Sequence, residues 1–312
     1  MYFYIITFII IFIIIYNILF KKDKNFENVW VGHERQYIDP KDGSTKEFTE
    51  IKKGDKGTIE VSIVIPAYNE EKRLPIMLDD TLKILNEKTK KNPNFTFELV
   101  IVDDGSRDKT SSLVLQYAER EGVDKVRLLK LLKNRGKGGA VKRGMLVSRG
   151  KYCLMADADG ATDFKDFDRV YDSMKKIESK QYGVVCGSRS HLVDSDVVAK
   201  RSFFRNLLMY GFHLVVQILC VRGIKDTQCG FKLFTRESAR HLFTSLHVER
   251  WAFDVELLYL AQTLHMPIAE VAVNWTEIDG SKLDPIASSI QMAKDILRIR
   301  LNYLFRFWTI SS

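Results

Sequence analysis

Between residues 59 and 189, short apolar runs rich in β-branched residues alternate with segments of helical periodicity. The five runs, each short enough for a buried strand, are residues 59–67, 97–102, 126–132, 152–156 and 183–186. After the first run, five apolar residues share one helical face: Leu74, Met77, Leu78, Leu82 and Leu85. This alternation predicts an α/β fold, a doubly wound and mostly parallel sheet with helices on both faces.

Polar or glycine-rich sequence follows four of the predicted strands. The segments are 68–71, 103–106, 134–140 and 157–160. Ligands of open α/β sheets bind in the crevice beyond the carboxyl ends of parallel strands. Each segment taken alone is more often a structural turn, and D-D-G-S at 103–106 is good turn chemistry. Their occurrence together in this order predicts a nucleotide site.

Two acids separated by one residue, Asp157 and Asp159, end the fourth apolar run. A divalent cation such as Mg²⁺ or Mn²⁺ relieves the repulsion between neighbouring carboxylates, and Mg²⁺ commonly completes its shell with substrate phosphates. The alternative is a polar strand end followed by a turn. We expect this pair to hold a metal ion against a diphosphate.

Residues 134–140 open a helix with the sequence N-R-G-K-G-G-A. Glycines allow the backbone to approach a phosphate, a helix N-terminus attracts anions, and Lys137 adds a positive charge. The segment lacks the G-x-x-x-x-G-K-[ST] frame of a Walker A loop. We expect Lys137 to contact the donor diphosphate.

The formal net charge of +8 indicates anionic partners. Much of the basic excess lies near apolar segments, which favours a membrane surface, and no aromatic-basic interleaving indicates nucleic acid. The four cysteines show no C-x-x-C spacing and are typical of core thiols in a reducing compartment. The sequence leaves the oligomeric state open, a homodimer included.

Residues 1–22 predict a single-pass transmembrane anchor. Tyr2 to Phe20 is almost wholly apolar, and Lys21, Lys22 and Lys24 follow. A cleaved signal peptide would need a basic start and a small-residue cleavage site, and neither is present. The positive-inside rule places the body of the protein in the cytosol. Residues 23–58 are expected to form a loosely structured linker.

Two further segments, 200–221 and 281–312, combine an apolar stripe with polar and basic residues. We expect both to be amphipathic helices in the membrane interface, the second with Ile290, Leu297, Leu301 and Leu304 on its apolar face. Core packing against the sheet is the alternative.

The motifs together resemble the family 2 glycosyltransferases of GT-A fold. The resemblance covers roughly residues 60–280 and implies a mixed, mostly parallel sheet in a catalytic domain over 59–280. Within the family, the chain is most similar to members that transfer glucose to dolichyl phosphate. The cues are D-A-D-G-A-T at 157–162, D-T-Q-C-G-F-K at 226–232 and W-A-F-D-V-E-L at 251–257.

The resemblance implies UDP-glucose as donor, Mg²⁺ or Mn²⁺ as cofactor, and inversion at the anomeric carbon. By analogy, the uridine would be surrounded by Pro66, Tyr68, Glu70 and Asp103. Asp157 and Asp159 would hold the metal and the diphosphate. Related enzymes often have a glutamine ligand two residues beyond the second aspartate, where this chain has Ala161.

The implied acceptor is dolichyl phosphate, whose isoprenoid tail stays in the bilayer. Arg189 and Arg201 are candidates to bind its phosphate, because arginine suits bidentate phosphate contacts. Asp226 is the candidate to orient or deprotonate the acceptor. The product would serve lipid-linked oligosaccharide assembly for N-glycosylation at the endoplasmic reticulum membrane. The alternatives are a mannosyl transferase using GDP-mannose, a polymerising synthase and a membrane-anchored scaffold without activity.

Overall fold

The structure is a computed structural model that describes residues 30–192, 215–278 and 285–311, together with residues 4–7, 10, 13, 16 and 211. Nearly all of the predicted catalytic domain lies within these ranges. The predicted anchor over 1–22 and the predicted interfacial helix over 200–221 lie largely outside the described residues, and Arg201 lies wholly outside them.

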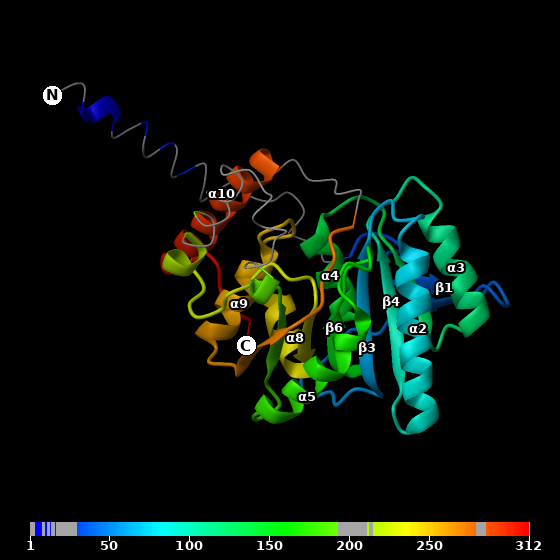
Figure 1. The fold of residues 1–312 in the computed structure, drawn as a ribbon. Helices are drawn as coiled ribbons and strands as arrows, with labels where there is room; N and C mark the ends of the chain where they lie inside the picture. The colour runs from blue at the N-terminus through cyan, green and yellow to red at the C-terminus, as the bar shows by residue number, and fades with distance from the viewer. Residues whose placement is uncertain are drawn as a thin grey trace.

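A seven-stranded mixed sheet forms the centre of the molecule, in the order β5-β4-β3-β6-β8-β7-β9 (Figure 1). Its strands are β3 (Ile59–Ala67), β4 (Phe97–Asp103), β5 (Val126–Lys130), β6 (Gly150–Met155), β7 (Val184–Ser188), β8 (Lys232–Thr235) and β9 (Ile268–Ala272). All neighbouring pairs are parallel except the two that involve β8. The prediction of a mixed, mostly parallel sheet is therefore confirmed.

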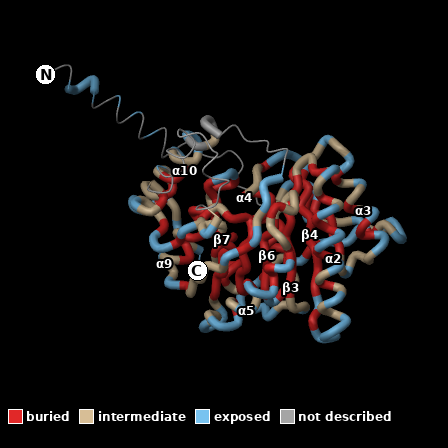
Figure 2. Tube along the Cα trace, in the orientation of Figure 1, coloured by how far each residue is buried: buried red, intermediate tan, exposed pale blue. Residues whose placement is uncertain are grey.

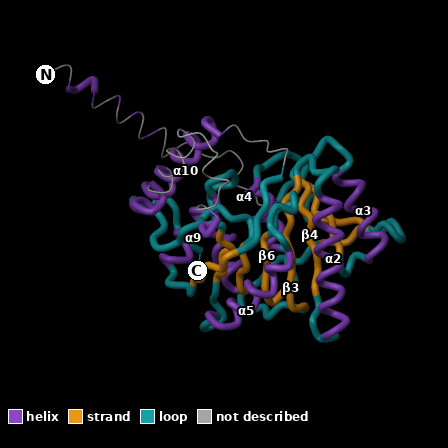
Figure 3. The backbone as a smooth tube through the Cα atoms, viewed as in Figure 1, coloured by secondary structure: helices purple, strands orange, loops and turns teal. Residues whose placement is uncertain are grey.

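Helices cover both faces of the sheet (Figure 3). One layer contains α2 (Leu74–Lys91), α3 (Thr110–Glu121) and α5 (Phe167–Ile177). The other contains α4 (Lys137–Leu146), α8 (Arg236–Ser245), α9 (Phe253–Thr263) and α10 (Pro285–Leu304).

Alternate side chains of each central strand enter the two helical layers. In β3, Ile63 and Ile65 pack with the first layer, and Val64 packs with the second. Because both faces are covered, the strand reads as a continuous apolar run. Figure 2 shows the buried residues concentrated along the strands.

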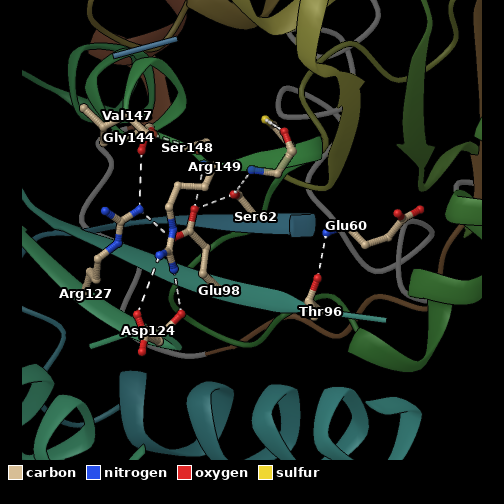
Figure 4. Close-up of polar contacts among 12 residues, drawn as sticks. Glu60, Ser62, Thr96, Glu98, Asp124, Arg127, Gly144, Val147, Ser148 and Arg149 are labelled. Atoms are coloured by element: carbon tan, nitrogen blue, oxygen red, sulfur yellow. Dashed lines mark hydrogen bonds and ion pairs between the residues drawn. The ribbon is translucent and has the colours of Figure 1, made fainter. Parts of the chain in front are cut away.

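A buried polar network ties the amino ends of four strands together (Figure 4). The Glu98 carboxylate is fully buried and accepts hydrogen bonds from the Ser62 hydroxyl at 2.6 Å and the Arg149 backbone N–H at 2.8 Å. It also pairs with the Arg127 guanidinium at 2.5 Å and with Nε of Arg149 at 2.9 Å. This network lies at the opposite edge of the sheet from the predicted site.

Residues 30–58, which we expected to be loosely structured, are folded onto the sheet. The hairpin of β1 (Gln36–Ile38) and β2 (Thr45–Glu47) is antiparallel, and Phe48 behind it is 1% exposed. The Arg127 guanidinium lies 4.7 Å from the Phe48 ring centroid. The prediction is wrong for this part of 23–58, because strands of three residues are too short to show periodicity.

Within the described part of the chain, no helix has the length and apolar character needed to cross a membrane. The helix predicted near the C-terminus is α10. Ile296 and Ile299 form its buried side, whereas Ile290 and Leu304 of the predicted apolar stripe are 54% and 55% exposed. Leu297 and Leu301 of the stripe are half-buried. The stripe therefore faces outward at Ile290 and Leu304, and Ile296 and Ile299 join the core that also contains α9.

Candidate active site

The carboxyl ends of the parallel strands bring the predicted donor-site residues to one edge. Tyr68 and Glu70 follow β3, and Asp103 is the last residue of β4. Lys137 begins α4 beyond β5, and Asp157 follows β6. These strands are neighbours in the order β5-β4-β3-β6, so their ends form a continuous row.

Asp157 and Lys137 meet at the centre of this edge, where Nζ of Lys137 lies 2.5 Å from Oδ1 of Asp157. Asp159 also faces a cation, with Nη1 of Arg73 at 4.0 Å from its Oδ2. The structure therefore brings into contact Lys137 and Asp157, both of which were expected at the donor diphosphate. It adds Arg73, which the sequence reasoning did not identify.

The two aspartates have opposite pKa shifts. Burial raises the pKa of Asp157, but the charges of Lys137, Arg189 and Lys232 together leave this pKa below its ordinary value. Burial and then the charge of Asp157 raise the pKa of Asp159. A second carboxylate that resists ionisation beside the first is an environment that added positive charge would relieve.

A cleft of about 710 Å³ lies next to Asp157, between α2 and the segment that follows β6. Its lining includes Asp157, Ala161, Phe231 and Thr276. Among the described residues, no three histidine, cysteine or acidic side chains are grouped so as to bind a metal ion. The Asp157 and Asp159 carboxylates are two candidate ligands, and one or two carboxylates are typical of Mg²⁺ sites that share the ion with phosphates.

The residues predicted to surround uridine have protein partners of their own. Glu70 is almost buried and holds Arg73 through two bonds, Oε2 to Nε at 2.7 Å and Oε1 to Nη2 at 2.6 Å. The buried Asp103 carboxylate accepts hydrogen bonds from the Ser106 backbone N–H at 2.8 Å and from the Ser111 hydroxyl. Pro66 and Tyr68 lie at the same strand end and are partly exposed.

Two of the three predicted acceptor-side residues, Arg189 and Asp226, are bonded to each other. Arg189 follows β7 directly, and Asp226 lies in the segment that leads into β8. Because β8 is antiparallel, its beginning lies at the edge where β7 ends. Nε of Arg189 lies 2.7 Å from Oδ2 of Asp226, and the Arg189 backbone N–H donates to the same oxygen at 2.9 Å. Arg189 outweighs the effect of burial and lowers the pKa of Asp226.

Gly230 lies directly against the Asp157 carboxylate, in the segment before β8 that also contains Asp226. A Cβ atom added at Gly230 would lie 2.0 Å from Oδ2 of Asp157, so only a hydrogen fits there. Two residues later, Nζ of the fully buried Lys232 lies 2.6 Å from Oδ1 of Asp254. Asp254 is therefore a buried ion-pair partner within the chain.

Sequence reasoning assigned no role to Arg73 or Lys232, because each meets its acidic partner only in the folded chain. Arg73 lies near Asp159, and Lys232 pairs with Asp254. Asp104 accepts backbone hydrogen bonds from Arg135 at 2.7 Å and Gly136 at 2.9 Å. Sequence reasoning could have assigned Asp104, the second acid of D-D-G-S, to holding the backbone before α4. Adjacent side chains at the end of a strand point to opposite faces, so Asp103 and Asp104 cannot both face the ligand.

Comparison with protein families gives one match over more than half of the chain. Residues 62–243 match the model of glycosyl transferase family 2. The matched region begins in β3 and ends in α8, and contains Arg73, Lys137, Asp157, Asp159, Arg189 and Asp226.

Two curated relatives are similar over most of their length. A dolichyl-phosphate beta-glucosyltransferase of Dictyostelium discoideum is 65% identical over 91% of this chain and 88% of its own length. A human protein of the same name is 56% identical over 82% of this chain and 79% of its own.

Among solved structures, glucosyl-3-phosphoglycerate synthase from Mycobacterium tuberculosis, in complex with Mn²⁺ and UDP-glucose, has a similar fold. Its TM-score is 0.51 at 19% identity, over 78% of this chain and 79% of that one. At this identity the likeness concerns the fold.

Proposed function

Because the chain belongs to glycosyl transferase family 2, we propose that it transfers glucose from UDP-glucose to dolichyl phosphate with inversion at the anomeric carbon. The chain is an enzyme, a glycosyltransferase, and relatives at 46–65% identity are named for glucosyl transfer to dolichyl phosphate. The observation that carries the chemistry is the contact of Lys137 with Asp157 beside Asp159 at the carboxyl edge of the sheet.

Asp157 and Asp159 are assigned to a divalent cation, Mg²⁺ or Mn²⁺. The raised pKa of Asp159 and the small number of protein ligands suit an ion that also binds the donor diphosphate. Such an ion would supply positive charge for the departing diphosphate.

The proposed reaction is a single displacement. An oxygen of the acceptor phosphate forms a bond to the anomeric carbon, the bond from that carbon to the β-phosphate oxygen breaks, and UDP leaves with the electron pair. A phosphate monoester has a second pKa near about 6 and is mostly dianionic at neutral pH, so little base catalysis is needed. Lys137 lies beside Asp157 and would stabilise the negative charge that develops on UDP.

Arg189 is assigned to the acceptor phosphate, and Arg201 is assigned the same role. The Asp226 carboxylate is engaged by Arg189 and has a lowered pKa, which favours an orienting role over that of a base. Asp226 would orient the Arg189 guanidinium by bonding the edge that carries Nε and Nη2. Pro66, Tyr68, Glu70 and Asp103 retain their assignment to the uridine side.

The same proposal includes attachment to the endoplasmic reticulum membrane, with a single-pass anchor over residues 1–22 and the catalytic domain in the cytosol. Four large apolar side chains near the end of the chain support contact with lipid, because each is at least half exposed. They are Ile290, Leu304, Phe305 and Phe307, between 51% and 57% exposed. Digestion of sealed membranes by protease tests the orientation, and protection of the catalytic domain would contradict it.

The decisive experiment measures transfer of radiolabelled glucose from UDP-glucose to dolichyl phosphate by the detergent-solubilised full chain, with Mn²⁺ or Mg²⁺. An Asp159→Asn variant is assayed in parallel. We expect metal-dependent glucolipid that is lost in the variant. Transfer from GDP-mannose in place of UDP-glucose would contradict the donor assignment, and a folded chain without transfer from either donor would contradict the proposal.

A further inference from the structure

A buried ion pair connects the N-terminal segment to the loop that opens α4. Glu34 precedes β1 and is 1% exposed, and Arg135 is 3% exposed. Nη2 of Arg135 lies 3.2 Å from Oε1 and 3.1 Å from Oε2 of Glu34. The two residues are 101 positions apart in the sequence. The contact therefore fixes two distant parts of the chain against each other.

Both carboxylate oxygens of Glu34 have a second hydrogen-bond donor. The Leu132 backbone N–H donates to Oε1 at 3.1 Å, and the Val31 backbone N–H donates to Oε2 at 3.1 Å. On the other side, Nε of Arg135 is buried without a hydrogen-bond partner among the described residues. The guanidinium thus depends strongly on Glu34, because a buried charge without its counter-charge is costly.

The loop that Arg135 begins leads directly to the donor-site lysine. Backbone N–H groups of Arg135 and Gly136 are bonded to Asp104, and Gly136 has a φ of +88°. Three residues beyond Gly136, Gly139 donates to the Glu249 backbone oxygen at 2.8 Å. Lys137 lies between these fixed points and reaches Asp157. A shift of Arg135 would therefore move the backbone that carries Lys137.

We infer that Glu34 is a positioning residue for the donor site, acting through Arg135 on the loop that presents Lys137 to the UDP diphosphate. The inference rests on the proposed function, since it assigns the loop to UDP. It gives residues 30–58, the N-terminal segment that is folded onto the sheet, a part in donor binding. No residue of this segment is placed in contact with the donor itself.

The same N-terminal segment offers a matched control. Asp55 pairs with Arg236 of α8, with additional bonds from Arg236 Nη1 to the backbone oxygens of Ser148 and Gly150 at 2.7 and 3.0 Å. This ion pair also attaches the segment to the domain, but at the amino end of β6. Its loss would loosen the segment without acting on the loop before α4.

The experiment measures UDP binding by calorimetry in the presence of Mn²⁺, steady-state kinetics and thermal unfolding on the full chain in detergent. The variants are Glu34→Gln, the double variant Glu34→Gln/Arg135→Gln, and Asp55→Asn. We expect Glu34→Gln to raise the UDP dissociation constant and the KM for UDP-glucose about tenfold, as loss of supporting contacts around a site typically does. The KM for dolichyl phosphate should stay within about twofold.

The double variant separates positioning from stability. It removes the unpaired arginine charge, so its Tm should recover relative to Glu34→Gln, while UDP binding stays weak because the loop is still not held. Asp55→Asn should lower Tm and leave UDP binding unchanged. UDP binding equal to wild type in both Glu34 variants would overturn this inference alone, whereas a wild-type chain that binds no UDP would overturn the proposed function as well.

Discussion

The guanidinium of Arg189 and the carboxylate of Asp226 form a two-bonded ion pair, with Nε to Oδ2 at 2.7 Å and Nη2 to Oδ1 at 3.0 Å. The ring centroid of Trp275 lies 5.5 Å from the same guanidinium. A candidate phosphate ligand and a candidate base are thus one unit in the structure. The pair orients the arginine, and the arginine holds the pKa of Asp226 below its usual range despite burial.

This pairing predicts unequal losses from two aspartate variants. Asp159→Asn removes charge from the metal and diphosphate site and should lower kcat by about 10²–10³-fold. Asp226→Asn keeps an oxygen that Arg189 can bond, so its main effect should be a rise of about tenfold in the KM for dolichyl phosphate. Glucolipid assays with each substrate varied in turn measure both. Equal losses of kcat in two folded variants would argue that Asp226 takes part in the chemical step.

Gly230→Ala should abolish metal-dependent UDP binding, because the new Cβ would lie 2.0 Å from Oδ2 of Asp157 and displace that carboxylate. We expect activity to fall by at least about 100-fold. Gly43→Ala is the control: it lies in the β1–β2 turn with a φ of +71°, and its Cβ would meet no atom within 4 Å. It should cost about 1 kcal/mol in the free energy of unfolding and leave activity intact. A Gly230→Ala variant that binds UDP as tightly as wild type would show that the Asp157 carboxylate can move without weakening metal-dependent UDP binding.

Glu98→Gln should destabilise the fold by about 3–5 kcal/mol at neutral pH, because it leaves buried Arg127 without its counter-charge. Burial raises the pKa of Glu98, but Arg127 and Arg149 outweigh burial and lower it. The charged Glu98 carboxylate therefore stabilises the fold fully at pH values above 4.5, the ordinary glutamate pKa. This contribution to the free energy of unfolding is lost as the pH falls further and Glu98 is protonated.

Denaturant unfolding of wild type and Glu98→Gln from pH 7 to pH 3.5 measures this effect. The difference in unfolding free energy should be constant near neutral pH and shrink under acid conditions. Asp124→Asn is the control, since the Asp124 side chain is 98% exposed and lies 3.8 Å from Arg149. It should change stability by less than about 0.5 kcal/mol. A difference in unfolding free energy between wild type and Glu98→Gln that stays the same at low pH would contradict the assignment of this stability to the charge of Glu98.

Lys142 predicts a second pH dependence, on the alkaline side. Burial lowers its pKa to about 8, partly offset by Glu249 and Glu256, and its ammonium donates to the Leu246 backbone oxygen at 2.8 Å. Between pH 8 and 10.5 the folded chain holds fewer protons than the unfolded chain, so stability rises with pH relative to Lys142→Met. The rise should be about 2–3 kcal/mol. Replacing the exposed Lys83 by Met should give no such trend. A difference in unfolding free energy between wild type and Lys142→Met that does not change with pH would refute the lowered pKa of Lys142.

The parallel strands were predictable because burial on both faces produces apolar runs that end in polar turns, as β3 and β6 do. β8 was not predicted, because its four residues include the buried Lys232, whose partner Asp254 lies 22 positions away. The hairpin before β3 and the contact of Glu34 with Arg135 were likewise invisible, since a single acid in a polar segment has no periodic pattern.

The reversed direction of β8 has an evolutionary consequence. The Gly187 backbone N–H donates to the Phe231 oxygen at 2.7 Å, so the chain between these residues departs from the sheet and re-enters it at nearly the same point. Closing such an excursion costs free energy that grows only slowly with its length. Apart from its last residues, which include Asp226 and Gly230, the segment between β7 and β8 can therefore be lengthened, shortened or exchanged while the donor half of the domain stays as it is. A common donor-binding scaffold could in this way acquire new acceptors by replacing one contiguous stretch of sequence.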